Sequence, residues 1–155
     1  MAQQPYTLAG AKVSISTTAA NTDLAGLSPG FAGLTYTQIS NIGNIGAYGF
    51  STNMVSYPTM DRSIVLKAKG QTDGGNLTIQ CAHSPGDAGQ LAAAAAADPT
   101  SQDNYVFKIE FANGVVHYVR GPVGGPNHPN GGPEAFAVDE YTVGVNEIEE
   151  VDISP

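Results

Sequence analysis

Short runs in which apolar and polar residues alternate recur along this chain, separated by Gly, Pro, Asn and Asp. An alternation of period two is typical of β-strands with one buried face, because successive side chains point to opposite sides of a sheet. Two further runs near the end of the chain, 135–144 and 145–153, are strand-like and acidic. The pattern predicts a mainly β protein of about eight strands. The six alternating runs are 12–18, 34–40, 62–69, 76–83, 105–112 and 115–120.

A single helix is predicted between the fourth and fifth of these strands. Ser84 and Pro85 suit the cap and the first position of a helix, and residues 90–97 are nearly all strong helix formers. Asp98-Pro99 ends the helix, because proline cannot continue it. Its small alanine side chains favour close packing against a sheet. The apolar run 92–97 is far too short to span a membrane.

The dipeptide Asn113-Gly114 lies between two alternating runs and predicts a tight hairpin. Both residues of a two-residue type I′ turn take positive φ, which Asn and Gly tolerate. The register would then pair residue 112 with 115 and residue 107 with 120. One face of the hairpin would be apolar, and it would carry Phe107, Ile109, Phe111, Val116 and Tyr118. The opposite face would carry Lys108, Glu110 and His117, with Val119 among them.

Two segments do not fit the strand pattern. Residues 121–133 are rich in Gly and Pro, which predicts an exposed irregular loop. Residues 41–61 form a segment longer than most loops of a compact domain. Disordered segments are usually polar and charged, whereas this one is rich in apolar residues and has Asp61 as its only charge, so its composition does not favour disorder. We expect this loop to contact another chain, with a flap folded back on its own domain as the alternative. Its apolar residues are Ile42, Ile45, Tyr48, Phe50, Met54, Val55 and Tyr57.

Length and charge narrow the classes of function. A chain of 155 residues suits a single domain, 1–155, and 41% hydrophobic residues suffice for a core. Charged residues make up only 13%, about half the usual share. The net charge is −8 with six Lys and Arg, too few for a strong phosphate-binding patch. The acidic C-terminal stretch is either a solvated surface or a surface that repels a polyanion.

No catalytic constellation can be assembled from the sequence. Cys81 and His83 lie two residues apart, as two metal ligands might, but no second pair stands at a metal-binding spacing, so ordinary packing is the preferred interpretation. Glu110 would face His117 across the hairpin, where an ion pair is commoner than an acid/base couple. His128 is a ligand by residue type alone. The sequence therefore predicts no catalytic residue, no cofactor and no metal, and hence no enzyme.

The order of the elements resembles that of the major tail tube proteins of siphophages. The resemblance covers most of residues 30–120, and it implies a β-sandwich or partial barrel with one flanking helix. Such subunits assemble as a hexameric ring with a continuous inner β-barrel, here from strands 34–40, 62–69, 105–112 and 115–120. The resembling segments are Gly43-Asn-Ile-Gly46, 60–75, His83-Ser-Pro-Gly-Asp-Ala-Gly-Gln90 and the strand that follows the helix.

The resemblance also implies a function and partners. Stacked rings would form the virion tail tube of a long-tailed phage, through which DNA is delivered without specific binding and without membrane insertion by this chain. Expected partners are further copies, a tape-measure protein, a tail terminator and tail-tip proteins. Segment 41–61 would bridge subunits or rings, and Lys108, Glu110 and His117 would be a candidate lumen face. The alternatives are a ring protein of a contractile injection or type VI secretion tube, a capsid-decoration or adhesin module, and a hydrolase or lectin.

Overall fold

The computed structural model describes residues 5–27 and 30–151, which form ten strands, one α-helix and one 3-10 helix at Gly30–Gly33. The mainly β fold with one helix is confirmed. The strands before the helix are β1 Lys12–Ser16, β2 Tyr36–Ile39, β3 Ile42–Ile45, β4 Ser51–Tyr57, β5 Leu66–Asp73 and β6 Asn76–Ala82. The helix α1 and the strands after it are α1 Ala88–Ala96, β7 Asn104–Glu110, β8 Val116–Asn127, β9 Val138–Gly144 and β10 Glu147–Val151. Asp152 and Ile153, which the sequence places in the last strand, lie outside the described residues.

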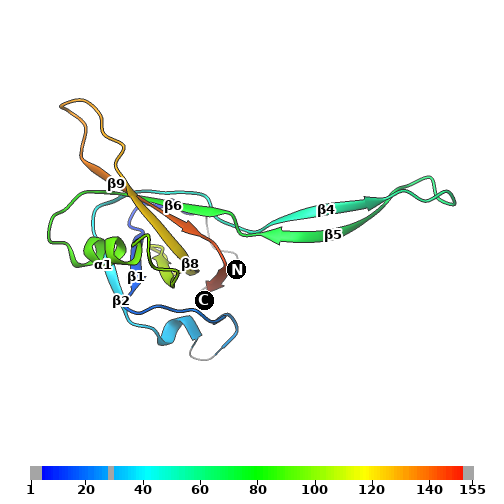
Figure 1. Cartoon of the computed structure of the whole chain (residues 1–155), viewed down its shortest axis with the longest axis horizontal. Coiled ribbons are helices and arrows are strands. Elements are labelled where there is room, and N and C mark those ends of the chain that lie inside the picture. Colours follow the sequence, from blue (N-terminus) through cyan, green and yellow to red (C-terminus); the bar gives the residue numbers. More distant parts are fainter. Residues whose placement is uncertain (1–4, 28–29, 152–155) are drawn as a thin grey trace.

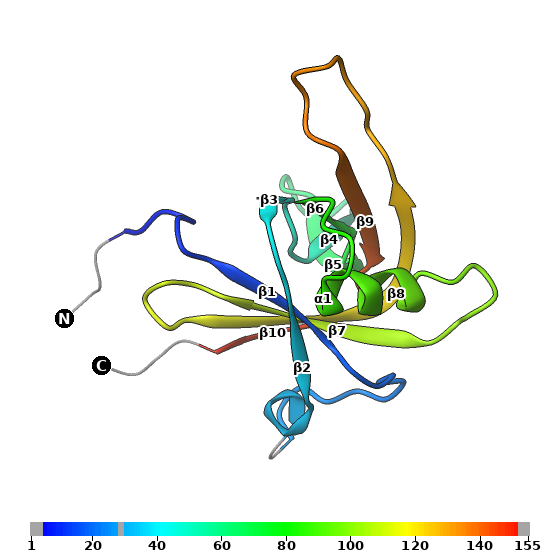
Figure 2. The ribbon, with the colours of Figure 1, turned by 90° about the vertical axis from the view of Figure 1, so that its left-hand side faces the viewer.

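Eight of these strands form one bent antiparallel sheet around a core (Figure 2). The hydrogen-bonded order is β2-β1-β7-β8-β9-β6-β3, with β10 added to β8. Strands β2 and β3 follow each other in the chain, so the two ends of this order meet at the short turn through Ser40 and Asn41. Asn41 takes a φ of 61°, which asparagine tolerates better than most residues. The result is a partly closed barrel.

The core fills the inside of this barrel, and α1 covers one side of it (Figure 1). Gly89 of α1 lies against the backbone of β2, where an added Cβ would stand 2.1 Å from the carbonyl oxygen of Gln38. The close packing expected of a small-faced helix is confirmed. The largest fully buried side chains are Tyr141, Phe31, Phe107, Ile15, Ile39, Leu77, Ile79, Ile109, Val13, Val106, Val119 and Val143.

The helix begins later than the sequence indicates. Gly86 takes a φ of +86°, so Ser84, Pro85 and Gly86 form a turn, and Asp87 is the N-cap. The Asp87 carboxylate accepts hydrogen bonds from the Gln90 N–H at 3.0 Å and from the Ser40 hydroxyl at 2.8 Å. Partial burial would raise the pKa of Asp87, but these hydrogen bonds outweigh it and hold the pKa below its usual value. The cap therefore also fixes the helix to the β2–β3 turn.

The predicted hairpin exists, but its register is wrong by one residue. Phe107 pairs with Val119 and Ile109 with His117, because three residues form the loop instead of two. The Phe111 N–H donates to the Val115 carbonyl at 2.9 Å, and Gly114 takes a φ of +93°. A three-residue loop that ends in a left-handed glycine is the next commonest hairpin connection. The slip exchanges the faces of all residues on β8.

The Gly/Pro-rich segment is only partly a loop. Strand β8 continues through it to Asn127 and pairs with β9 from Val123 onward, with a bulge between Gly124 and Asn127, so the prediction of an irregular segment from residue 121 is wrong. Gly121 lies where β8 passes from pairing with β7 and β10 to pairing with β9. A Cβ at Gly121 would lie 1.7 Å from the Gly144 carbonyl oxygen, which leaves no space for any other residue. The glycine here permits close strand contact rather than disorder.

Candidate interaction surfaces

Strands β4 and β5 form a two-stranded hairpin that projects far from the barrel (Figure 1). We call residues 51–73 the arm. Segment 41–61 is therefore not a loop, because it contains β3 and β4. The predicted strand 62–69 does not join the main sheet of this chain; the observed strand begins at Leu66 and runs through Gly70 to Asp73. Every residue of β5 is exposed, so the arm has no core of its own.

The two faces of the arm differ in chemistry. Val55 pairs with Ala68 and Tyr57 with Leu66, and residues directly opposite each other share a face. These four side chains form what we call the apolar strip of the arm. The other face carries Met54 opposite Lys69 and Ser56 opposite Lys67.

Apolar residues of the arm remain in solvent to an unusual extent. Tyr57 is 70% exposed, Ile64 76%, and Met60 at the tip is fully exposed. Isolated monomers seldom expose a large contiguous apolar surface, so these residues are the candidates for contact with a partner. The further exposed apolar residues in and beside the arm are Phe50, Met54, Val55, Val65 and Leu66.

The seven apolar residues predicted to contact another chain fall into two groups. Ile42, Ile45 and Tyr48 pack against the barrel core. Burial, with a contribution from Glu150, raises the pKa of the Tyr48 hydroxyl to about 12. The other four lie in or next to the arm and are more than half exposed: Phe50, Met54, Val55 and Tyr57. The second group is therefore the more exposed of the two.

The candidate lumen face is divided by the observed register. Lys108 and Glu110 lie on the face of the sheet that carries Tyr118, and Lys108 Nζ is 2.6 Å from Glu110 Oε1. His117 lies on the opposite face, where its ring contacts Phe111 edge-on at a centroid distance of 5.0 Å. The expected Glu110–His117 pair is therefore wrong, since Glu110 faces Val116. Register partners add further residues to the Lys108 face: Lys12, Ser14, Gln38 and Glu149.

Lys108 is held in place on this face by more than its pairing with Glu110. Lys108 also lies 5.5 Å from the centre of the Tyr36 ring. Burial, followed by Tyr118 and Glu149, raises the pKa of the Tyr36 hydroxyl, so this phenol stays neutral. One end of the face is covered by the segment that contains Phe31, which stacks on Tyr118 at a centroid distance of 5.3 Å. Sequence alone did not indicate Lys12, Gln38 or Glu149, because their place depends on strand order.

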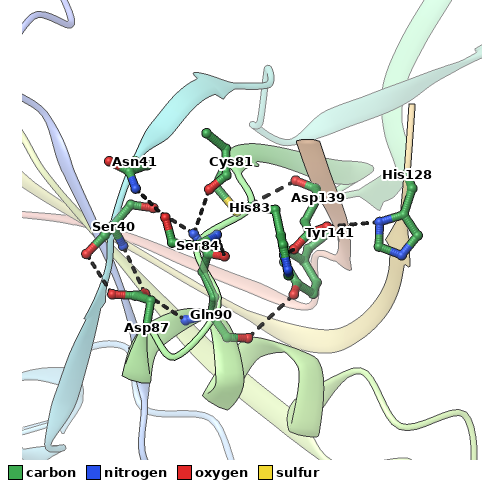
Figure 3. Close-up of polar contacts among 11 residues, drawn as sticks. Ser40, Asn41, Cys81, His83, Ser84, Asp87, Gln90, His128, Asp139 and Tyr141 are labelled. Atoms are coloured by element: carbon green, nitrogen blue, oxygen red, sulfur yellow. Dashed lines mark hydrogen bonds and ion pairs between the residues drawn. The ribbon is translucent and has the colours of Figure 1, made fainter. Parts of the chain in front are cut away.

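The three histidines and Cys81 do not form a metal centre. His83 and His128 each approach a different oxygen of the buried Asp139 carboxylate, at 2.7 and 2.9 Å (Figure 3). The two rings lie on different sides of this carboxylate, which fastens the β8–β9 loop to the end of β6. Burial raises the pKa of the Cys81 thiol to about 11, with Asp139 adding to the effect. Among the described residues, no three or more His, Cys, Asp or Glu side chains could hold a metal ion together.

The Asp139 cluster adjoins a small apolar groove next to Leu91 of α1, with a volume of about 140 Å³. Gln90 borders it, and its side chain donates to the carbonyls of Ser40 and Ala82 at 3.1 and 2.9 Å (Figure 3). These contacts hold the helix, the β2–β3 turn and β6 together. In residues 5–27 and 30–151 no helix is long and apolar enough to cross a membrane.

The sequence matches no protein-family model and no curated protein. Its structure, however, is similar over nearly the whole chain to parts of contractile particles. A chain of the PVC sheath/tube terminator, from an extracellular contractile injection system in the extended state, has a TM-score of 0.68 at 13% identity, covering 98% of this chain and 100% of that one. A chain of the anti-feeding prophage baseplate has a TM-score of 0.68 at 7% identity, covering 97% of each chain.

A third similar structure is the anti-feeding prophage tube terminating cap, with a TM-score of 0.64 at 13% identity, covering 99% of this chain and 95% of that chain. At such identities the likeness establishes a shared fold. The fold is therefore one that occurs in tube, cap and baseplate parts of phage-tail-like particles.

Proposed function

We propose that this chain is a ring-forming structural subunit of a phage-tail-like tube, of the contractile kind. The observation that carries the proposal is the arm, whose apolar strip and tip have no partner within the described part of the chain. The whole-chain likeness to terminator, baseplate and cap structures supports this reading. It favours the contractile alternative over the tail tube of a siphophage.

In this proposal the arm of each copy binds a neighbouring copy, and the Lys108 face of the sheet lines the channel. Lys108 is paired with Glu110, and six copies at −8 carry a formal charge of about −48, which disfavours binding of a polyanion to the wall. The subunit needs no catalytic group or cofactor for this passive role. The proposal further includes a ring of six copies, tape-measure and tail-tip proteins as partners, and DNA as the transported molecule.

A tube terminator is a second candidate, since two of the similar structures carry that role in their descriptions. The two roles differ in stacking, because a tube subunit stacks ring on ring whereas a terminator forms a single ring that ends a tube. The distinction can be measured on the purified chain alone.

The test is the assembly state of the whole chain over a wide range of concentration and salt. Analytical ultracentrifugation should show a discrete large species, and negative-stain microscopy should show rings on the order of 100 Å across. Stacks of rings would indicate a tube subunit and single rings a terminator. A chain that is monomeric under every condition would overturn the proposal and would favour a decoration or adhesin module.

A further inference from the structure

Strand β10 is an open edge of the main sheet. It pairs with β8 through Ile148 opposite Val119 and Glu149 opposite Tyr118, and with no second strand among the described residues. Its side chains alternate, so Glu147 and Glu149 share the face of Tyr118 while Ile148 packs on the core side. Glu149 has no ion-pair partner in the described part of the chain. The Glu147 carboxylate is only 11% exposed, lies 3.6 Å from the Arg120 side chain and accepts hydrogen bonds from the N–H groups of Leu24 and Ala25, so Glu149 is the carboxylate that is free for a partner.

Strand β5 of the arm is also an open edge, because it pairs only with β4. Leu66 and Ala68 belong to the apolar strip, and Lys67 and Lys69 lie on the other face. Within the described residues neither lysine forms an ion pair. The arm as a whole carries a formal charge of +1. Because the net charge of the chain is −8, the remainder of the chain carries −9.

The two edges have the same spacing of side chains and opposite charges at corresponding positions. Both strands alternate with a period of two, with lysines at 67 and 69 and glutamates at 147 and 149. We propose that β5 of one copy adds to the free edge of β10 in a second copy. In this antiparallel pairing Lys67 would lie opposite Glu149 and Lys69 opposite Glu147 on one face, and Ala68 would lie opposite Ile148 on the other. Main-chain hydrogen bonds supply affinity in such strand addition, and alternate side chains supply specificity.

The same charges disfavour the competing pairings. Two β5 edges would place lysines opposite lysines, and two β10 edges would place glutamates opposite glutamates, which is destabilising. Lysines on an edge strand commonly prevent unwanted pairing. The lysines of β5 therefore favour an acidic edge as the partner. The other edge strands of the main sheet, β2 and β3, carry no charge and so offer the lysines no opposite charge. Because the arm differs from the surface it binds, the contact is head-to-tail and generates rings or filaments instead of closed dimers.

This inference rests on the proposed self-assembly, and charge reversal tests it. The Lys67→Glu/Lys69→Glu chain should need a concentration about tenfold or more above that of the original chain before assemblies appear by light scattering and microscopy. Adding Glu149→Lys should restore a large part of the loss. Adding Glu150→Lys, the matched control on the opposite face of β10, should not restore it, although both triple variants have the same formal charge.

The outcomes separate the inference from the proposed function. If the unaltered chain never assembles, the proposed function fails and this inference fails with it. If the unaltered chain assembles and the Lys67→Glu/Lys69→Glu chain assembles at the same concentration, only the edge pairing is overturned. Equal rescue by Glu149→Lys and Glu150→Lys would also overturn it, because general charge repulsion would then explain the effect.

A second measurement does not depend on charge reversal. Chains with Lys67→Cys and chains with Glu149→Cys are mixed and oxidised mildly, and disulfide-linked dimers are counted on a non-reducing gel. Native Cys81 is buried, so it is protected in the folded chain. The pair should cross-link several-fold more than Lys67→Cys mixed with Glu150→Cys. Equal yields would contradict the pairing.

Discussion

The apolar strip of the arm gives a prediction that separates assembly from folding. We consider the triple variant Val55→Thr/Tyr57→Thr/Leu66→Thr, in which threonine keeps a high strand propensity. These side chains are 52%, 70% and 41% exposed in the single chain. Complete burial of such a side chain from full exposure is worth about 1.5–3 kcal/mol. Burial of the part that is still exposed is therefore worth about 1 kcal/mol for each residue.

The triple variant should thus lose about 3 kcal/mol of association free energy for each arm contact, equivalent to a rise of about 100-fold in the dissociation constant. Its free energy of unfolding as a monomer should change by no more than about 1 kcal/mol, because the strip contacts no core. Sedimentation velocity at graded concentrations measures the first quantity, and thermal unfolding of dilute chain measures the second. Phe136→Thr is the control, since Phe136 is 79% exposed but lies outside the arm.

Two results would refute this reasoning. Assembly at the concentration of the unaltered chain would show that the apolar strip is not an interface. A loss of several kcal/mol in the free energy of unfolding would show instead that the strip packs against its own domain. In that case the extended arm would not be the conformation in solution.

Two further predictions concern the body of the fold. Gly121→Ala should lower the free energy of unfolding by about 3 kcal/mol or more, because the alanine Cβ would overlap the Gly144 carbonyl oxygen. Chemical denaturation measures this loss. An unchanged denaturation midpoint would contradict the observed strand contact. Asp87→Ala should cost about 1 kcal/mol at pH 7 by removing the cap at Gln90 and the bond from Ser40. Because the pKa of Asp87 is lowered on folding, this contribution to stability is present above about pH 4 and is lost as pH falls through the lowered value. The unfolding curves of the Asp87→Ala chain and the unaltered chain should therefore converge in acid. An equal difference in the free energy of unfolding at pH 7 and at pH 3 would contradict this prediction.

Sequence reasoning succeeded where a local pattern decides the structure. The run 76–83 alternates as far as Cys81 and forms β6, and the alanine-rich run of strong helix formers forms α1. It failed where a neighbouring element decides. Gly121 was interpreted as a loop residue, yet it is a strand residue whose missing side chain allows the Gly144 backbone to approach. Asn113-Gly114 specifies a turn, but whether that turn has two or three residues depends on which faces of β7 and β8 can be buried.

The candidate site shows the same division. Composition alone identified an apolar segment with a single charge, and Met54, Val55 and Tyr57 in it are exposed. The prediction that the whole segment lies outside the core is wrong for Ile42, Ile45 and Tyr48, which pack against the core. Only the tertiary structure showed that this segment pairs with β5 as a projecting arm, since pairing joins residues that are distant in sequence. The alternation that predicts a strand is identical for a strand in a core and a strand in an arm. The sequence by itself determined most of the strands outside 41–61 and 121–127, and it indicated apolar surface that the core does not bury. Strand order and register decided which side chains share a face, because these depend on contacts along the whole chain.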